Sequence, residues 1–465
     1  MAMMMQLFFE YGLLASGWAR NVLIDVDDAG LITSISAGED VPAGGVSGQI
    51  ALPGMANLHS HAFQRAMVGL GEWRSAGNSA GNENDDFWSW REVMYRFLDR
   101  LRPEDLEAVA AQLYVEMLES GFTAVGEFHY LHHQPNGVSY DHITEMSERL
   151  MVAAKDAGIG LTLLPVCYSA GGFGGAAVSD AQQRFYNDAD RFLTLASECR
   201  KQAVNQPRCI IGIAPHSLRA VAPEILQDII NANSDGPIHI HIAEQVGEVE
   251  DCIAWSGARP VEWLFEHVEV DERWCLVHAT HMDAAEIKKL ATSRAVAGLC
   301  PATEANLGDG IFEGVAYQQA SSSEGSRWGI GTDSHIRVDV AEELRSLEYS
   351  QRLRDLGRNR LVGKGQANGR ALYDAALKGG AQALGQKMGG FEVGCYADIV
   401  SLNANHPLLI GKHGDDWLNA WIFSGDKTCV KDVWASGKHV VKDGQHMARE
   451  AMLKPFAAAM KHLTA

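Results

Sequence analysis

The chain has 465 residues, of which 46% are hydrophobic and 21% charged. This composition is typical of a globular protein, and the length allows one large domain plus a smaller one, because single domains stop growing near ~250–300 residues. The formal net charge of −20 argues against nucleic acid as a partner, since it would repel a phosphate backbone. No apolar run reaches the ~20 residues that span a bilayer, and no basic region precedes the first apolar stretch, so we expect no membrane partner and a cytoplasmic location.

Residues 1–52 predict strands rather than helices. Short apolar pieces alternate with polar residues, and Asp28-Ala29-Gly30 is expected to form a hairpin turn. We expect this segment to form the first part of a small β domain outside the main fold.

Between residues 53 and 389, short apolar runs alternate with longer helix-like segments, which is the order of a parallel sheet covered by helices. Eight runs rich in Val, Ile and Leu lie at residues 56–61, 123–128, 160–166, 209–215, 237–244, 274–280, 295–301 and 328–334. Eight such units fit a closed barrel better than an open doubly wound sheet, and no G-x-G-x-x-G follows the first run. The sequence therefore predicts an α/β fold, a (β/α)8 TIM-type barrel.

The loop after the first run is long and polar. Residues 71–86 are rich in Gly and Asn, a composition that suits either a mobile lid or a passive surface loop.

Residues 390–446 again have a pattern that predicts short strands joined by turns, with Ser436-Gly437 and Asp443-Gly444 as turns. We expect them to complete one small β-sandwich with residues 1–52. Residues 447–465 have helical periodicity and are expected to pack on the surface. The eight cysteines include no C-x-x-C pair and are expected to be buried free thiols.

Histidine and aspartate side chains follow several of the predicted barrel strands. His59 and His61 lie two residues apart at the end of the first run, so an extended backbone points both rings to one side. Such a pair alone is more often a core or surface feature, but His241 ends the fifth run, His278 the sixth and Asp333 the eighth. Because the carboxyl ends of barrel strands meet at one face, these side chains should converge. Nitrogen and carboxylate donors suit a divalent metal ion.

These positions resemble the amidohydrolase superfamily, in its branch of deaminases with one metal ion. The resemblance rests on the H-x-H pair, on the histidines and aspartate after the later strands, and on residues 390–398, which look like the superfamily segment G-x-x-x-G-x-x-A-D. It covers nearly the whole chain. No lysine occurs in TAVGEFHY, in the fifth run or in CIIGIAPHS, where members with two metal ions would carry a bridging one. The resemblance therefore implies one divalent ion, Zn²⁺ in the first place, held by His59, His61, His241 and Asp333.

Several longer segments are similar to those of the superfamily members that act on a formimino group. These segments are LHSHAFQRAM, FWSWREVMYR, EFHYLHH, HSLRAV, HIHIAEQ, LVHATH and PATEANLGDGIF. This similarity implies hydrolysis of N-formimino-L-glutamate to N-formyl-L-glutamate and ammonia, in histidine degradation. Asp333 would take a proton from the attacking water, and His278 would polarise or orient the reacting group. Glu244 would pass a proton to the departing amine. These roles can partly exchange.

A small anionic substrate with two carboxylates needs planar bidentate donors, which guanidinium supplies better than ammonium. Arg219 follows the fourth run, and Arg91 ends the aromatic cluster Phe87-Trp88-Ser89-Trp90. The family-like set of substrate contacts is completed by Gln64, Tyr130 and His216. Each has a structural alternative, such as an arginine stacked on surface aromatics or a tyrosine closing the end of the barrel. His335 is expected only as a partner of the residues that hold the metal.

Two other functions stay open at this point. A deaminase of the same branch that acts on a guanine-, cytosine- or adenosine-like base would need stacking groups, which Trp88 and Trp90 could supply, although paired arginines argue against it. An inactive barrel that serves as a binding protein would be expected to have lost a metal ligand, and every ligand is present. A homodimer is one of the assemblies that the sequence leaves open.

Overall fold

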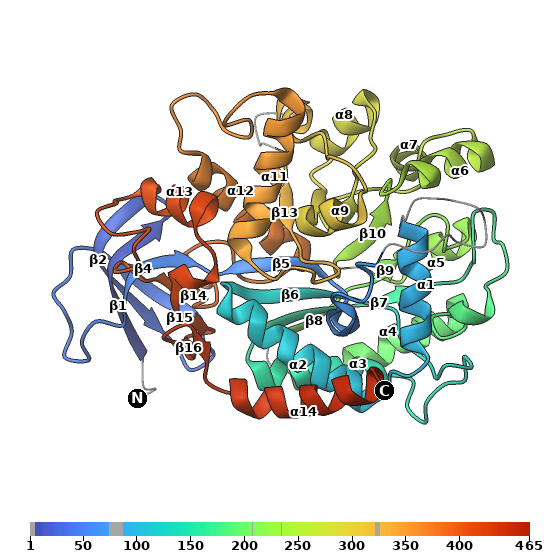
Figure 1. Ribbon diagram of the computed structural model, residues 1–465, viewed down its shortest axis with the longest axis horizontal. Helices are drawn as coiled ribbons and strands as arrows, with labels where there is room; N and C mark the ends of the chain where they lie inside the picture. The colour runs from blue at the N-terminus through green and yellow to red at the C-terminus, as the bar shows by residue number, and fades with distance from the viewer. Residues whose placement is uncertain (1–4, 74–86, 207, 234, 321–325) are drawn as a thin grey trace.

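The computed structural model describes residues 5–73, 87–206, 208–233, 235–320 and 326–465, with the backbone alone for 87–89 (Figure 1). Its strands are β1 (Met5–Leu14), β2 (Gly17–Val26), β3 (Ile32–Ser36), β4 (Gly48–Pro53), β5 (Met55–Ser60), β6 (Phe122–His129), β7 (Gly160–Cys167), β8 (Cys209–Ile211), β9 (Ala214–Pro215), β10 (Ile238–Ile242), β11 (Trp274–His278), β12 (Val296–Leu299), β13 (Trp328–Ile330), β14 (Ile399–Leu402), β15 (Val430–Ala435), β16 (Lys438–Lys442) and β17 (Gln445–His446).

The α-helices are α1 (Phe87–Leu98), α2 (Pro103–Glu119), α3 (Glu145–Ala157), α4 (Ala189–Ala203), α5 (Pro223–Asn231), α6 (Val246–Ser256), α7 (Pro260–His267), α8 (Ala284–Thr292), α9 (Pro301–Leu307), α10 (Gly314–Ala320), α11 (Val340–Asp355), α12 (Asn368–Leu384), α13 (Asp415–Ser424) and α14 (Arg449–Leu463). The 3-10 helices within the described residues are η1 (Ala62–Met67), η2 (Asp180–Gln182) and η3 (Lys427–Cys429).

Strands from the two ends of the chain share one sheet, on the left of Figure 1. Its order is β17-β16-β15-β14-β4-β1-β2-β3, and β14 joins the two halves by pairing antiparallel with β4. The predicted hairpin turn lies between β2 and β3, where the Asp27 carboxylate accepts the N–H groups of Ala29 and Leu31. Ser436-Gly437 and Asp443-Gly444 have positive φ angles throughout, as tight hairpin turns require.

The middle of the chain forms parallel strands. One sheet has the order β10-β11-β12-β13 and the other β5-β6-β7-β8, with β9 also on β7. Parallel bridges join Ile213 to Ile238 and Ser60 to Asp333. Helices α2, α3 and α4 pack against β6, β7 and β8, while α12 packs against β5, β12 and β13. All eight predicted runs contain strands, and the result is an α/β fold consistent with a TIM-type barrel.

The fourth predicted strand is interrupted, because the run 209–215 divides into β8 and β9 around Gly212. A Cβ atom at Gly212 would lie 2.5 Å from the Pro237 carbonyl oxygen, so only glycine permits this approach. At this point the chain changes partner: Gly212 N–H donates to Leu163, and Ile213 N–H donates to Pro237.

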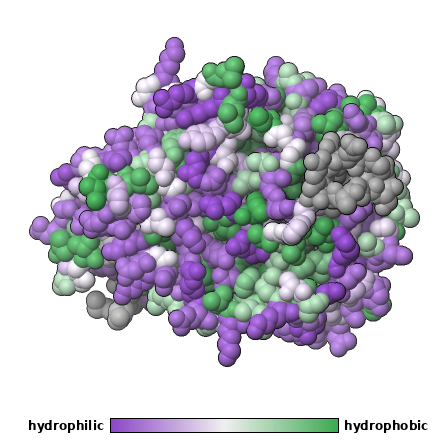
Figure 2. Space-filling view, in the orientation of Figure 1, coloured by the Kyte–Doolittle hydropathy of each residue, from purple (hydrophilic) through white to green (hydrophobic). Residues whose placement is uncertain are grey.

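The C-terminal helix α14 runs along the bottom of Figure 1 and packs against α2, as the periodicity of 447–465 predicts. All eight cysteines are unpaired, but Cys209 and Cys395 are only half-buried, which corrects the expectation that every thiol is buried. None of the helices in the described ranges is both long and apolar enough to cross a membrane. Figure 2 shows a face that is mostly hydrophilic and broken by small apolar patches.

Candidate metal centre and active site

The predicted metal-binding side chains come from the carboxyl ends of parallel strands. His59 lies in β5 and His61 just after it, His241 lies in β10, and Asp333 follows β13. A Cβ atom at Gly331 would lie 2.8 Å from the backbone nitrogen of His59, so the glycine lets β5 and the end of β13 approach closely. His59 carbonyl accepts the N–H of Asp333 at 3.0 Å, and Asp333 carbonyl accepts the N–H of His61 at 3.2 Å.

The backbone at these strand ends adopts an unusual conformation. His278, Ala279, Asp333 and His335 have φ angles of +67°, +48°, +41° and +61°, and Ala243 after β10 has +52°. Left-handed non-glycine residues cost about 1–3 kcal/mol each and gather at functional sites. Here they turn the chain out of the strand while the side chains of His278 and Asp333 stay directed into the site.

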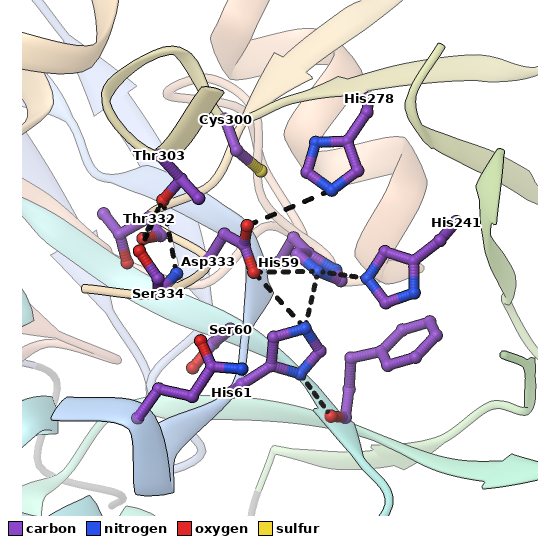
Figure 3. Close-up of polar contacts among 12 residues, drawn as sticks. His59, Ser60, His61, His241, His278, Cys300, Thr303, Thr332, Asp333 and Ser334 are labelled. Atoms are coloured by element: carbon purple, nitrogen blue, oxygen red, sulfur yellow. Dashed lines mark hydrogen bonds and ion pairs between the residues drawn. The ribbon is translucent and has the colours of Figure 1, made fainter. Parts of the chain in front are cut away.

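Three imidazoles and one carboxylate face a common point (Figure 3). Nε2 of His59 lies 3.0 Å from Nε2 of His241 and 3.2 Å from Nε2 of His61. Oδ1 of Asp333 lies 3.3 Å from Nε2 of His61 and 3.5 Å from Nε2 of His59. All four side chains are buried.

Backbone carbonyls fix which ring nitrogen faces inward. Nδ1 of His61 donates to the Phe128 carbonyl at 2.9 Å, and Nδ1 of His241 donates to the His216 carbonyl at 3.1 Å. The Nε2 lone pairs of these two rings therefore point to the centre, as for metal-binding histidines.

The electrostatics of this cluster suit a cation. Burial lowers the pKa of His59 to about 3, and it also lowers the pKa values of His61 and His241, so the rings are neutral. Burial alone would raise the pKa of Asp333, but the hydrogen bond to His59 and the electrostatic influence of the imidazoles of His61 and His278 outweigh this and lower it, so the carboxyl remains ionised. Three neutral ring nitrogens and a carboxylate that converge on one point are the donor set of a divalent metal. The residues present therefore fit the predicted ion.

His278 lies beside this cluster rather than within the trio of facing imidazoles. Its Nε2 is 3.7 Å from Oε1 of Glu244 and 3.9 Å from Oδ2 of Asp333, and has no hydrogen-bond partner in the described part of the chain. Burial opposes protonation, but the carboxylates of Glu244, Glu304 and Asp333 raise the pKa of His278 well above its usual value. Burial in turn raises the pKa of Glu244 to about 7. An imidazole, a carboxylate and a carboxyl of raised pKa thus stand together, which suits proton transfer.

A cavity of about 550 Å³ adjoins the cluster. Its walls include the three predicted catalytic residues and all five residues predicted to contact substrate, which are Gln64, Arg91, Tyr130, His216 and Arg219. Trp90 also lines the cavity, while nothing is described for the side chain of Trp88. The structure thus brings the whole predicted set to one place.

Two tyrosines organise the polar wall of this cavity. Arg91 donates to the Tyr168 hydroxyl at 3.0 Å, and Gln182 donates to the same hydroxyl at 2.9 Å. On the other side, the amide of Gln64 donates to the Tyr130 hydroxyl at 3.1 Å. Oε1 of Gln64 is buried and accepts no hydrogen bond from any described residue, so it can receive an N–H group from a ligand.

Arg91 and Arg219 place two guanidinium groups on the wall of this cavity, in a chain of net charge −20. The two arginines also affect His216. Burial is the main cause that holds the pKa of His216 well below its usual value, and the positive charges of Arg219 and Arg91 lower it further. A neutral His216 that shares the cavity wall with two cations is compatible with an anionic ligand there.

His335 has the supporting position expected of it. It contacts the Ser60 hydroxyl at 3.1 Å and the Thr332 hydroxyl at 2.8 Å, next to residues that carry the metal-binding side chains. For the loop 71–86, predicted as a lid or a passive loop, residues 74–86 lie outside the described part of the chain.

Sequence reasoning did not single out two acidic residues near the site, Glu304 and Asp309. Glu304 contacts His278, and Asp309 places a carboxylate oxygen within 4.8 Å of ligand atoms of Glu244 and His278. The Asp309 carboxylate accepts a hydrogen bond from Gln245, and burial together with Glu244 raises the pKa of Asp309 to about 9. Both residues lie in PATEANLGDGIF, a segment that entered the sequence analysis only through its resemblance.

The fold and the site together are those of a hydrolase with a candidate metal centre beside a cavity lined by Arg91 and Arg219. The sequence model of the amidohydrolase family matches residues 50–440, and the chain belongs to this family. Together with the deiminase relative described next, this membership identifies a hydrolase that acts on C–N bonds.

Individual relatives narrow the comparison. The chain is 50% identical over 462 residues to a formimidoylglutamate deiminase from Pseudomonas aeruginosa, covering 99% of this chain and 100% of that protein. It is similar to the crystal structure of an amidohydrolase from Brucella melitensis, with a TM-score of 0.93, 47% identity and coverage of 99% and 100%. The fold also matches a zinc-bound adenosine deaminase from Xanthomonas campestris, with a TM-score of 0.78, 21% identity and coverage of 99% and 98%.

Proposed function

We propose that the chain hydrolyses N-formimino-L-glutamate to N-formyl-L-glutamate and ammonia, as a step of histidine degradation. The observation that carries this proposal is that one cavity combines the His/Asp cluster with Arg91 and Arg219. The relative from P. aeruginosa, 50% identical over its full length, carries the name of this activity. A substrate with a formimino group at one end and two carboxylates uses both halves of such a cavity.

His59, His61, His241 and Asp333 would hold one divalent ion, and their nitrogen and carboxylate donors favour Zn²⁺. When bound, such an ion would lower the pKa of water, so that a nucleophile able to attack an amidine-like carbon is available at neutral pH. A similar fold has been crystallised with zinc.

The three remaining catalytic groups divide the movement of protons. Asp333 accepts the first proton of the attacking water, and its Oδ2 faces His278 at 3.9 Å. Glu244, whose raised pKa keeps a proton available near neutral pH, donates to the formimino nitrogen. His278 directs Nε2 at the reacting group and stabilises the negative charge that develops on the oxygen and nitrogen bonded to the reacting carbon. Glu244 gives the nitrogen one proton and Asp333 passes on the proton that it took from water, so =NH leaves as NH₃. The hydroxyl proton of the tetrahedral adduct goes to Glu244, and the formyl C=O remains.

The glutamyl part is recognised by charge and shape. Arg91 and Arg219 each pair with a carboxylate, and Gln64 Oε1 accepts an N–H of the substrate. Tyr130 and His216 complete the wall. The residues that bind the glutamyl part are thus separate from those that carry out the reaction. Binding energy from the glutamyl part can therefore be used to position the formimino carbon.

We also infer that the parallel strands close into one (β/α)8 barrel within residues 53–389. The bridges Ser60–Asp333 and Ile213–Ile238 lie where the two parallel sheets would meet, which supports closure. Residues 1–52 and 390–446 would form the β-sandwich, with 447–465 as a separate helix. A buried apolar cluster that includes Phe9, Ile24, Ile399 and Trp434 supports a shared core between the chain ends.

The experiment that tests the proposal is product analysis with and without metal. Purified protein given N-formimino-L-glutamate should release ammonia and N-formyl-L-glutamate in equal amounts. A chelator should abolish turnover, and zinc should restore it. Full activity in a demonstrably metal-free sample would contradict the assignment of the metal, and release of formate or glutamate in place of the formyl product would contradict the assigned reaction.

A further inference from the structure

A buried carboxylate lies behind His278, on the side of the ring away from the reaction. Glu304 in α9 accepts a hydrogen bond from Nδ1 of His278, with 3.3 Å between the atoms. The same oxygen, Oε1, accepts the backbone N–H of Cys300 at 2.8 Å, which fixes the carboxylate in place. Both side chains are buried, so water does not compete for these bonds.

The opposite edge of the same ring faces the reaction. Nε2 of His278 lies 3.7 Å from Glu244 and 3.9 Å from Asp333, and makes no hydrogen bond with the described residues. Rotation of an imidazole by half a turn exchanges carbon and nitrogen positions at both edges. The ring at His278 therefore needs a fixed partner on Nδ1 if Nε2 is to point at the substrate.

We propose that Glu304 is a positioning residue that holds His278 through Nδ1 and so aims Nε2 at the reacting group. The consequence for catalysis rests on the proposed function, whereas the hydrogen bond itself does not. Glu304 does not itself line the cavity and is not one of the metal-binding side chains; it contacts the cavity wall through His278. Its effect should therefore pass through His278 alone.

The competing explanation is that Glu304 only stabilises the start of α9 by accepting the Cys300 N–H. Glu343 offers a matched control, because it is also buried and its Oε2 accepts the N–H of Ala302 at 2.9 Å, in the first turn of the same helix. Among the described residues, no hydrogen bond or ion pair joins Glu343 to His278. If the start of α9 were all that mattered, Glu343→Gln and Glu304→Gln should have similar effects.

The experiment compares Glu304→Leu, Glu304→Gln and Glu343→Gln in the zinc-loaded protein. Glu304→Leu should lower kcat by about 10–100-fold with little change in KM, because substrate contacts remain. Glu304→Gln keeps an acceptor and should lose less, while Glu343→Gln should keep wild-type kcat. Adding Glu304→Leu to His278→Asn should cause little further loss, since residues that act through one contact are not additive.

Proton NMR of the ¹⁵N-histidine-labelled protein supplies a readout that needs no turnover. The Nδ1 proton of His278, assigned by its loss in His278→Asn, should be protected from exchange in the wild type and in Glu343→Gln. It should move upfield in Glu304→Gln, where the acceptor is neutral, and exchange rapidly in Glu304→Leu.

An unchanged Nδ1 signal in both Glu304 variants would overturn the positioning role. So would equal kcat losses in Glu304→Gln and Glu343→Gln, or an equal loss from Glu304→Leu with and without His278. Failure of the wild type to act on N-formimino-L-glutamate would overturn the proposed function instead, and would leave the NMR test of Glu304 in force.

Discussion

Arg208 and Asp398 form a buried bidentate ion pair between parts of the chain 190 positions apart. Nη1 and Nη2 of Arg208 lie 2.8 and 2.7 Å from the two carboxylate oxygens, and the side chains are 6% and 3% exposed. Arg208 precedes β8 and Asp398 precedes β14, so the pair ties the parallel strands to the sheet of chain-end strands. Asp398 is also the aspartate of the family-like segment 390–398, which gives that residue a structural role.

Replacement of Asp398 by Asn should destabilise the protein strongly. The variant leaves the buried guanidinium without a counter-charge, which costs about 3–5 kcal/mol in the free energy of unfolding. Urea unfolding measures this loss. Glu198→Gln, which breaks the exposed pair with Lys201, should cost under about 1 kcal/mol. Equal losses in both variants would show that the buried pair has no special weight.

Glu127 should make stability depend on pH. Its carboxylate accepts hydrogen bonds from Ser60, Ala62 and Tyr114, yet burial raises its pKa from 4.5 to about 7. Between these values the unfolded chain loses the proton while the folded chain keeps it, so this contribution to stability falls as pH rises. The loss levels off above pH 7 at about 3 kcal/mol.

The variant Glu127→Gln cannot ionise and should lack this component. Unfolding in urea at pH 5, 6 and 8 should show the stability of the variant, relative to wild type, improving as the pH rises. A difference between the two proteins that stays constant with pH would mean that Glu127 keeps an ordinary pKa in the folded state.

Asp333→Asn should lose most of kcat even where metal is retained. An amide cannot accept the proton of the attacking water, and loss of a general base costs about 10²–10⁴-fold. Metal content and kcat should be determined on the same sample, so that poor metal binding is not mistaken for poor proton transfer. Near-normal kcat in a metal-loaded variant would remove the proton-transfer role.

Arg219→Met should reduce kcat/KM by about 2–5 kcal/mol in free-energy units, as for a broken desolvated charge pair. Methionine keeps the apolar stem and deletes the charged fork. Metal content and thermal stability should stay close to wild type. Arg345→Met provides a control, because Arg345 bonds to carbonyls of Ile422 and Gly425 away from the cavity and should affect stability only. Wild-type kcat/KM in Arg219→Met would exclude a substrate contact.

The parallel strands and the residues at their ends could be predicted because the signal is local. A strand buried on both faces is a short run of β-branched and aliphatic residues, and His59, His241, His278 and Asp333 each stand where such a run stops. Once the strands are parallel, their ends share one face, so convergence of the side chains follows from the architecture.

What the sequence could not predict depends on contacts between distant segments. The break at Gly212 arises from the Pro237 carbonyl on the next strand, and the contact of Glu304 with His278 depends on where α9 packs. The position of β1 between β2 and β4 in the sheet likewise depends on the tertiary structure, because alternating apolar residues do not specify which strands pair. In each case the residue type is visible in the sequence but its partner is not.

The most direct test of the central claim is a substrate comparison on one preparation of known metal content. Ammonia release should be measured with N-formimino-L-glutamate, guanine, cytosine and adenosine, and kcat/KM determined for each. Arg91 and Arg219 in the cavity wall predict efficient turnover of the dicarboxylate and negligible turnover of the two neutral bases and the neutral nucleoside. Turnover of any base with a kcat/KM equal to or above that for N-formimino-L-glutamate would contradict the proposed function.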